Sequence, residues 1–357
     1  MDATFVTSPQ DIVRPNWTYF TFFSESRDGG GVAVPVVETL ALSLIFVVSL
    51  LGNICAITLL ARKKRLVSAN CFVLNLFCAD LLFISTIPCI LATRWSGAWV
   101  LGDFCCHILF YVMSLSGCVT ISSLAAVSLE RMVCIMRLHQ ASSCDVKVVA
   151  GGLLSIWGFS ALTTVPLCVF FRVTTQPANG KDFQICTLIW PTVESEIIWD
   201  IAFVILDFLI PGLSIIIGYS KIYQITKETR RNLTASMAHV ESQELLVSQK
   251  DYKLFRTLMV LMFSFFVMWS PIVITVLLIA VRNFKKDFTI SSTLFFWIMT
   301  FTFANSALNP ILYNVSDVRH KWWQVLCCRL SNKESDSSDA TTRRNDHEQP
   351  DLSIVGK

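Results

Sequence analysis

The sequence predicts an all-α membrane protein: a seven-transmembrane helix bundle followed by a short amphipathic helix. Two observations favour this fold class. Of 357 residues, 54% are hydrophobic and only 15% are charged, and the mean hydropathy is +0.58, whereas a soluble domain usually carries about 25% charged residues. Long apolar stretches also follow one another along the chain, each near the roughly 20 residues that a helix needs to cross a bilayer.

Seven such stretches are expected to span the membrane. They lie at residues 36–61, 69–94, 102–136, 146–170, 196–224, 252–282 and 289–314. Only helices and closed barrels satisfy their backbone groups in lipid. Because barrel strands alternate in character over about 10 residues, runs this long and continuous predict helices.

The basic residues predict the orientation. The run RKKR at 62–65 follows the first span, and a second basic group between Lys221 and Arg231 follows the fifth. Because cytoplasmic loops carry an excess of Lys and Arg, these loops predict a plasma-membrane protein with its N-terminus outside and its C-terminus in the cytosol. The N-terminus lacks the basic start and apolar run of a cleaved signal peptide, so we expect the first span to direct insertion.

This topology divides the chain into four parts. The expected parts are an extracellular N-tail at 1–35, a membrane domain at 36–314, an amphipathic surface helix at 315–330 and a disordered cytoplasmic tail at 331–357. On the outer tail, Asn16 begins an Asn-Trp-Thr acceptor for glycosylation. The alternative for Asn16 is a chance match to the motif.

The C-terminal part carries two groups of candidate modification sites. The stretch "VSDVRHKWWQVLCCRL" places aromatic and basic anchors on one interfacial helix. Cys327 and Cys328 would then lie at the membrane surface, suited to palmitoylation or else idle. The polar tail is either simply disordered or a phosphorylation cluster. Its candidate sites are Ser335, Ser337, Ser338, Thr341 and Thr342.

Several functions are disfavoured by the residues. The net charge of +3 is small and no nucleic-acid motif accompanies it, and the thirteen cysteines lack zinc spacing. No nucleophile–base pair or metal-ligand set is seen, so we expect neither an enzyme nor a cofactor. A transporter or channel is the alternative from another class, but it should show internal repeats, and none is found.

Polar and kinking residues recur inside the predicted spans, where charged groups are costly and usually functional. They are Asp80 in "NLFCADLLFIS", Glu130 and Arg131 in "SLERMVCI", Trp269 and Pro271 in "VMWSPIV", and Asn309-Pro310 in "FANSALNPILYN". Each motif alone is weak evidence. Seven spans that carry all of them in this order resemble the rhodopsin-like (class A) G-protein-coupled receptors, over about residues 36–330.

The resemblance implies roles for these residues. Glu130 and Arg131 would form the lock at the G-protein face, with Met132 in place of the common tyrosine. The implied sodium pocket consists of Asp80, Thr120, Asn305 and Asn309. The implied activation switch consists of Trp269, Pro271, Asn309, Pro310 and Tyr313.

The resemblance also implies a disulfide between the outer end of the third span and the second outer loop. Counting back from Arg131 favours Cys106, with its neighbour Cys105 as the rival, and Cys186 is the loop partner. The extracellular face is oxidising, which suits such a bond.

The resemblance also disfavours two ligand classes, because this sequence lacks the residues that bind them in related receptors. Phe303 stands where an opsin carries its lysine, and Met113 stands where an amine receptor carries an aspartate. Apolar and aromatic stripes on the outer halves of the spans instead favour a lipid-like ligand, although each stripe could also be helix or lipid packing. The candidate ligand-binding residues are Arg94, Phe83, Trp99, Phe110, Met113, Ser114, Gly117, Trp190, Trp199, Phe203, Asp207, Trp269, Ile272, Phe295, Phe296 and Thr302.

Arg94 follows the second span in "ILATRWSGAW", at its outer end. A guanidinium gives a planar fork that matches a carboxylate, so Arg94 is a candidate for holding a ligand's acid. The alternatives are snorkelling to the surface or an ion pair with Glu38 or Asp103.

Further stretches, among them "LFYVMSLSG" and "ICTLIWPT", look like the long-chain members of the free fatty acid receptors. That resemblance implies activation by medium- and long-chain fatty acids, including omega-3 acids. It implies signalling through Gq, with Gi as a second candidate, and through arrestin, and it makes Arg94 the acid's partner. The alternative is a receptor for another acidic lipid or a peptide. Asp207 departs from the pattern, because an amide is expected there and a carboxylate would repel the ligand's acid unless neutral or paired.

Overall fold

The computed structural model describes residues 19–25, 32–62, 68–136, 146–178, 181–235, 242–282 and 290–317. Two compact units divide the chain, Met1–Tyr313 and Asn314–Lys357. The first unit holds the helices discussed below. Several expected features fall outside the described residues, namely Asn16, the amphipathic helix at 315–330 beyond Asp317, Cys327, Cys328 and the phosphorylation cluster, and they stay predictions.

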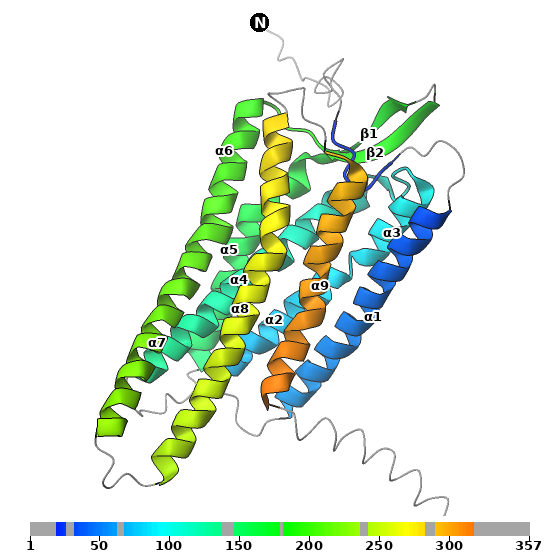
Figure 1. The fold of residues 1–357 in the computed structure, drawn as a ribbon. Coiled ribbons are helices and arrows are strands. Elements are labelled where there is room, and N and C mark those ends of the chain that lie inside the picture. Colours follow the sequence, from blue (N-terminus) through cyan, green and yellow to red (C-terminus); the bar gives the residue numbers. More distant parts are fainter. Residues whose placement is uncertain are drawn as a thin grey trace, which may run out of the picture. The chain divides into compact units, whose positions relative to one another are not determined.

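Helices dominate the described residues, and seven of the stretches are long and apolar enough to cross a membrane, as the sequence predicts. The helical segments, shown in Figure 1, are α1 (Ala33–Ala61), α2 (Ser68–Ile84), α3 (Ile87–Ser96), α4 (Gly102–Met136), α5 (Val146–Phe170), α6 (Val193–Phe203), a π-helical turn η2 (Val204–Leu209), α7 (Ile210–Ala235), α8 (Ser242–Arg282) and α9 (Ser292–Asp317). The second span is made of α2 and α3, and the fifth of α6, η2 and α7.

Prolines and one π-helical turn mark the irregular points of the spans. Pro88 occupies the first turn of α3, where its missing N–H costs no helical hydrogen bond. Pro271 lies inside α8 and Pro310 inside α9, where each removes one backbone hydrogen bond. The π-helical turn carries Asp207, and such turns are frequent at functional sites.

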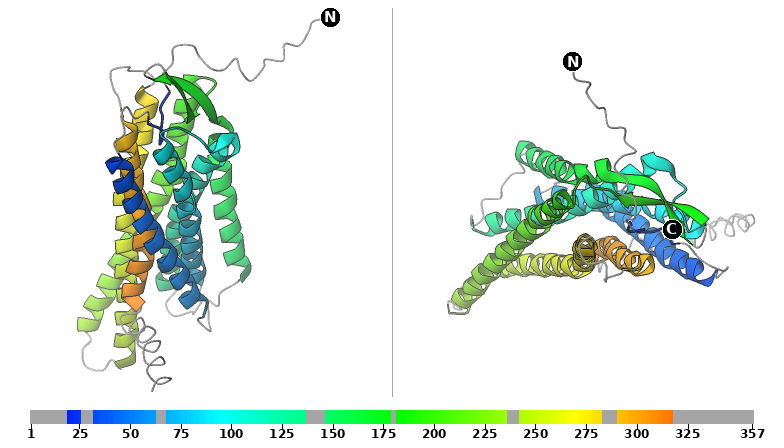
Figure 2. Two further views of the ribbon diagram at one scale, coloured as in Figure 1. Left: turned by 90° about the vertical axis from the view of Figure 1, so that its right-hand side faces the viewer. Right: turned by 90° about the horizontal axis from the view of Figure 1, so that it is seen from above.

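Two antiparallel strands form a hairpin that the helical pattern of the sequence did not reveal. Strand β1 (Phe171–Ala178) pairs with β2 (Lys181–Leu188), so that Phe171 lies opposite Leu188 and Val173 opposite Cys186. The hairpin lies over one end of the helices (Figures 1 and 2). We call this the hairpin end of the bundle.

The apolar side chains form two large buried clusters along the helices. The first gathers at the hairpin end and is rich in phenylalanine, including Phe110, Phe295 and Phe296. The second lies further along the same helices and includes Phe77 and Phe265. Many large apolar side chains point outward instead, which suits helices surrounded by lipid rather than by water.

Candidate functional site

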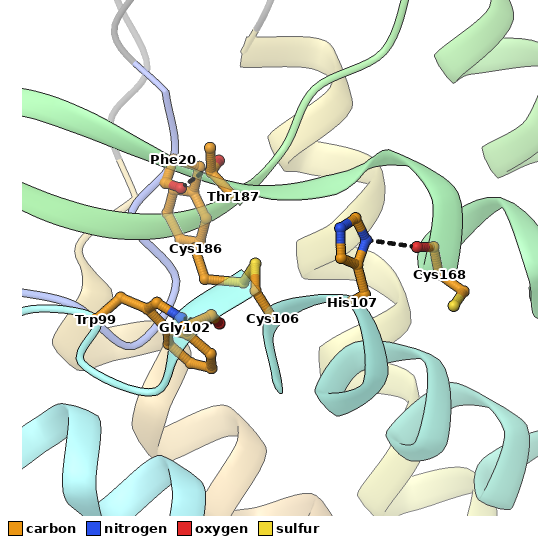
Figure 3. Close-up of a disulfide and its surroundings, with 8 residues drawn as sticks. All are labelled: Phe20, Trp99, Gly102, Cys106, His107, Cys168, Cys186 and Thr187. Carbon is orange, nitrogen blue, oxygen red and sulfur yellow. Dashed lines mark hydrogen bonds between the residues drawn. A yellow bond between two sulfur atoms is a disulfide. The ribbon is translucent and has the colours of Figure 1, made fainter. Parts of the chain in front are cut away.

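A disulfide joins the start of α4 to strand β2 at the hairpin end. The bond links Cys106 and Cys186, with 5.6 Å between their Cα atoms, and Cys105 is free. The implied pairing is therefore confirmed and the rival cysteine is set aside. Beside the bond, Trp99 donates its indole N–H to the Gly102 carbonyl at 2.9 Å, and Thr187 donates to the Phe20 carbonyl at 2.8 Å (Figure 3).

The segment 19–25 packs into the hairpin end of the bundle, although the sequence predicts only an outer tail there. Phe20, Phe22 and Phe23 are each at most 6% exposed. The Phe22 ring lies 4.8 Å from the Phe110 ring and 5.3 Å from the Phe295 ring, between their centroids. The short segment thus forms part of the wall of the cavity described next.

An apolar cavity, here called the upper cavity, lies between the helices below the hairpin. Its wall is made almost wholly of apolar and aromatic side chains, with Ser114, Glu196 and Asp200 as the polar members. The apolar wall comprises Phe22, Phe83, Phe110, Met113, Leu167, Phe171, Leu188, Trp199, Phe203, Trp269, Ile272, Val276, Ile279, Phe295 and Met299. Such a wall suits the hydrocarbon part of a ligand.

A second cavity, here called the deep cavity, continues from the first. Five residues line both: Ser114, Phe203, Trp269, Ile272 and Val276. The other members of the deep cavity are Gly117, Cys118, Ile121, Val204, Asp207, Phe208, Phe265 and Val273. The two cavities are therefore neighbours, and an elongated ligand that passes the shared side chains would contact both.

A glycine lets the tryptophan at the junction of the two cavities approach α4. A Cβ atom added to Gly117 would lie 2.5 Å from ring atoms of Trp269, closer than side chains come. The Trp269 ring also stacks on Phe265 at 5.3 Å and lies 5.2 Å from Phe83, between centroids. Because Trp269 lines both cavities, a movement of its ring would change the space in each of them.

Most of the candidate ligand-binding residues line these cavities. From the candidate set, the upper or deep cavity contains Phe83, Phe110, Met113, Ser114, Gly117, Trp199, Phe203, Asp207, Trp269, Ile272 and Phe295. Five candidates lie outside both linings: Arg94, Trp99, Trp190, Phe296 and Thr302. Trp190 instead packs on Phe170 and Trp199, and Thr302 donates to the Met268 carbonyl at 3.1 Å, linking α9 to α8.

Arg94 is buried, with 1% of its surface exposed, and two acidic side chains hold it. Its Nε donates to Glu38 Oε2 at 2.9 Å, and a terminal nitrogen bonds the other Glu38 oxygen. The same terminal nitrogen lies 2.9 Å from Glu25 Oε2. The Phe296 ring covers the guanidinium at 5.0 Å. Of the alternatives for Arg94, the structure has the ion pair with Glu38; it has neither a snorkelling side chain nor a bond to Asp103 among the contacts of the described residues.

The implied sodium-pocket residues are all buried around Asp80. Its two carboxylate oxygens accept hydrogen bonds from Ser306 at 3.0 Å and from Asn309 at 2.8 Å. The Asn305 amide is 1% exposed, and neither its oxygen nor its nitrogen has a hydrogen-bond partner among the described residues. Carboxylate, hydroxyl and amide oxygens are suitable ligands for a hard cation, and Asn305 has an oxygen to spare for one.

Glu130 and Arg131 form an ion pair on α4, with 3.5 Å between Arg131 Nε and Glu130 Oε2. Both side chains are 21% exposed. Tyr313, from the predicted switch, lies 3.5 Å from the Asn70 amide oxygen. The Glu130–Arg131 pair lies within α4, whereas the Tyr313 contact joins α9 to α2.

Sequence reasoning missed several residues of the site. The three phenylalanines of segment 19–25, Phe171 of the hairpin and the acidic pair Glu196 and Asp200 were not among the candidates. The signal for the hairpin was present: Asn179-Gly180 between two stretches rich in β-branched residues is typical of a tight hairpin. No periodic signal marks segment 19–25, because its role depends on distant packing.

The chain is similar to known seven-transmembrane receptors. Residues 52–313 match the family described as 7 transmembrane receptor (rhodopsin family). Free fatty acid receptor 4 of Mus musculus is 55% identical over 335 residues, which is 93% of each chain, and that of Rattus norvegicus is 54% identical over the same shares. Galanin receptor type 1 of Rattus norvegicus is 29% identical over 330 residues, 89% of this chain and 90% of that protein.

Proposed function

Because the chain belongs to the rhodopsin family of seven-transmembrane receptors, we propose that it is a receptor for medium- and long-chain free fatty acids, unsaturated omega-3 acids among them. The observation that carries the proposal is the apolar wall of the upper cavity. The similar proteins named Free fatty acid receptor 4 support the same ligand class. We further propose signalling through Gq, with Gi as a second partner, and through arrestin.

The hydrocarbon chain of the ligand would lie against aromatic rings. Trp199 stacks on Phe203 at 4.9 Å, and Phe110 stacks on Phe171 at 3.9 Å, between centroids. Flat ring faces on several sides suit a bent, unsaturated chain as well as a straight one. A peptide would leave its backbone groups unsatisfied in such a cavity, which favours a fatty acid over a peptide. The alternative that remains is another acidic lipid.

The acid of the ligand needs a cationic partner, and Arg94 is our candidate although it lies outside the two cavity linings. Glu38 is fully buried and grips the guanidinium from one side, whereas Glu25 is 34% exposed. Glu25 also lies on segment 19–25, three residues after the cavity residue Phe22. We therefore propose that the ligand's carboxylate replaces Glu25 at Arg94 while Glu38 stays bound.

Activation is a shift between two populations of the bundle. A ligand moves this equilibrium only by binding the active state better than the resting state. The end of the chain would press on Trp269, α8 would pivot at Pro271, and the Glu130–Arg131 pair would part so that Arg131 faces the G protein. The helices move and no covalent bond is made or broken, as expected of a receptor rather than an enzyme.

A sodium ion would favour the resting state. Asp80, Thr120, Asn305 and Asn309 would hold it, and the unpartnered Asn305 amide supports that assignment. Bound there, the ion would supply positive charge to a buried carboxylate that otherwise has only neutral donors.

The proposed topology places the hairpin end outside the cell at the plasma membrane. Segment 19–25 would then meet ligand entering from the outer side, and Arg131 would face the cytosol. The C-terminal residues, with the palmitoylation and phosphorylation candidates, would contact membrane lipid and arrestin.

The test is calcium release in cells that express the chain, across a panel of long-chain fatty acids and their methyl esters. Wild type should respond to the acids and respond far less to the esters. Arg94→Gln, at matched surface level, should lose the response to the acids. Equal responses of wild type and Arg94→Gln would remove Arg94 from the ligand site and keep the receptor assignment. No response of wild type to any fatty acid would contradict the proposed function.

A further inference from the structure

Asp207 places a half-satisfied carboxyl group in the floor of the deep cavity. The residue lies in the π-helical turn η2 and is 3% exposed. Its Oδ1 accepts a hydrogen bond from the Thr163 hydroxyl at 3.0 Å. Its Oδ2 is buried and has no hydrogen-bond partner among the described residues. Buried polar atoms are nearly always paired, so an unpaired carboxylate oxygen beside a cavity points to a missing partner.

Among the described residues, the wall around Asp207 supplies only a weak donor. Its neighbours in the deep cavity are aliphatic or aromatic, apart from Gly117, Ser114, the Cys118 thiol and the Trp269 indole. The thiol adjoins the carboxyl group, but S–H is a weak donor. The Trp269 indole N–H is itself without a partner among the described residues, and it is not bonded to Asp207. None of the residues that line this cavity is basic.

The deep cavity is where the far end of an elongated ligand would lie. It shares five wall residues with the upper cavity, as described above. From Phe110 in the upper cavity to Cys118 beside Asp207, α4 rises about 12 Å at 1.5 Å per residue. A long hydrocarbon chain that extends past the shared wall residues, Trp269 among them, would bring its last carbons to the Asp207 carboxyl group.

We propose that Asp207 selects long-chain fatty acids that carry a hydroxyl group at or near the end remote from the acid. The hydroxyl would donate its hydrogen to Oδ2 and complete the pairing of the carboxyl group. This inference rests on the proposed function and names a more specific class of ligand for the same cavity.

Chemistry favours a hydroxyl over the other polar groups. Thr163 donates to Asp207, and Asp207 only accepts in its contacts with the described residues, so the site calls for a further donor. A second carboxylate would be repelled by Asp207. An ammonium group would have to shed its water in a wall that is otherwise apolar, which is costly for a charge. A hydroxyl is a neutral donor and adds little bulk to the chain.

The same geometry would let the receptor discriminate between fatty acids with and without the remote hydroxyl group. An unsubstituted hydrocarbon chain leaves Oδ2 of Asp207 without a hydrogen-bond donor and without water. A chain with a hydroxyl group donates a hydrogen bond to it. Sites built to bond a ligand hydroxyl reject the analogue without it much more strongly than apolar pockets reject an added methylene.

The experiment compares palmitic acid, omega-hydroxypalmitic acid and omega-methoxypalmitic acid in calcium release, with surface level measured for every variant. On wild type the hydroxy acid should be about tenfold more potent than palmitic acid, as expected for one hydrogen bond to a charged group. Asp207→Leu, which has a similar shape and no acceptor, should reverse this preference. Glu194→Leu is the matched control, because it removes an exposed acidic side chain of the same span that lines neither cavity, and it should leave the potency ratio unchanged.

A second variant, Asp207→Asn, tests the inference if Asp207→Leu does not reach the cell surface. Asp207→Asn presents an amide N–H₂ donor to the cavity, so the methoxy acid, which only accepts, should become about as potent as the hydroxy acid. Equal potency of palmitic and omega-hydroxypalmitic acids on wild type overturns the inference, as does a preference that both Asp207 variants retain. A wild type that responds to palmitic acid without preferring the hydroxy acid overturns this inference alone. A wild type that responds to neither overturns the proposed function and this inference with it.

Discussion

Two of the charged side chains that the bundle buries lie in contrasting surroundings, Arg94 at the hairpin end and Asp207 beside the deep cavity. Arg94 is bonded by Glu38, Glu25 and the Phe23 carbonyl, and an aromatic ring covers it. Asp207 has one hydroxyl donor and one unpaired oxygen. The difference teaches that burial alone does not mark a ligand site. A buried charge that the fold pairs completely stabilises the fold and can take a ligand only by exchanging a partner, as proposed for Glu25 at Arg94, while a charge left half paired beside a cavity has a position open for a ligand.

The largest expected effect is a loss of stability when Arg94, the fully paired charge, loses its buried partner Glu38. Glu38→Leu leaves the Arg94 guanidinium buried with only the partly exposed Glu25 as its acidic partner. Breaking a buried ion pair by removing one partner costs about 3–5 kcal/mol of stability. We expect a large loss of folded receptor at the surface and a lower melting temperature of the purified protein.

The double variant Arg94→Met with Glu38→Leu provides the control. Removing both charges should restore most of the stability that Glu38→Leu loses, because no charge is then left unpaired. A double variant less stable than the two single variants combined would contradict the view that the pair acts as a unit.

A steric change in the deep cavity should have the next largest effect. Gly117→Ala adds a Cβ atom where the Trp269 ring lies, so the ring must move. Overpacking of this kind costs about 1–3 kcal/mol, and we expect it to appear as weaker fatty-acid potency in calcium release. Gly158→Ala is a matched control, because nothing lies within 4 Å of the added atom there. Unchanged potency in Gly117→Ala would separate Trp269 from ligand binding.

Removing the hydroxyl donor of Asp207 should have a smaller effect. Thr163→Val keeps the shape of the side chain and deletes the donor to Oδ1. Such a loss leaves a buried acceptor unpaired and costs about 1–3 kcal/mol of stability, below the cost at Glu38. Thermal melting of the purified variants measures both, and a loss at Thr163 as large as that at Glu38 would break the contrast between the two regions.

The smallest expected effect on stability is at Glu25. Its side chain is one-third exposed, and pairs with solvent access contribute about 1 kcal/mol or less. Glu25→Gln should therefore fold normally. If a ligand's acid replaces Glu25 at Arg94, the variant should respond to lower concentrations of fatty acid than wild type does. A response at higher concentrations would show that Glu25 assists binding rather than competing with it.

Sequence reasoning reached the seven spans from strong local signals, and it reached the disulfide from the family resemblance. Each span is a long apolar run, and the implied cysteine pairing is the one that the structure has. It also reached the cavity residues on α4 and α6, since one helical face carries Phe110, Met113 and Gly117 toward the same space.

The missed features depend on contacts between distant parts of the chain. Phe22 reaches the cavity only because segment 19–25 folds back under the hairpin, where Thr187 bonds the Phe20 carbonyl. The pairing of Arg94 with both Glu38 and Glu25 joins residues 56 and 69 positions apart. No pattern within a helix encodes such partners, so the sequence left the ion pair as one alternative among several.

The contrast between the two buried charges is tested most directly by melting purified Arg94→Leu and Asp207→Leu receptors beside wild type, without added ligand. Because Arg94 stabilises the fold and Asp207 faces an open cavity, Arg94→Leu should melt far below wild type, while Asp207→Leu should melt close to it. An Asp207→Leu receptor destabilised as strongly as Arg94→Leu, or an Arg94→Leu receptor as stable as wild type, would contradict that account.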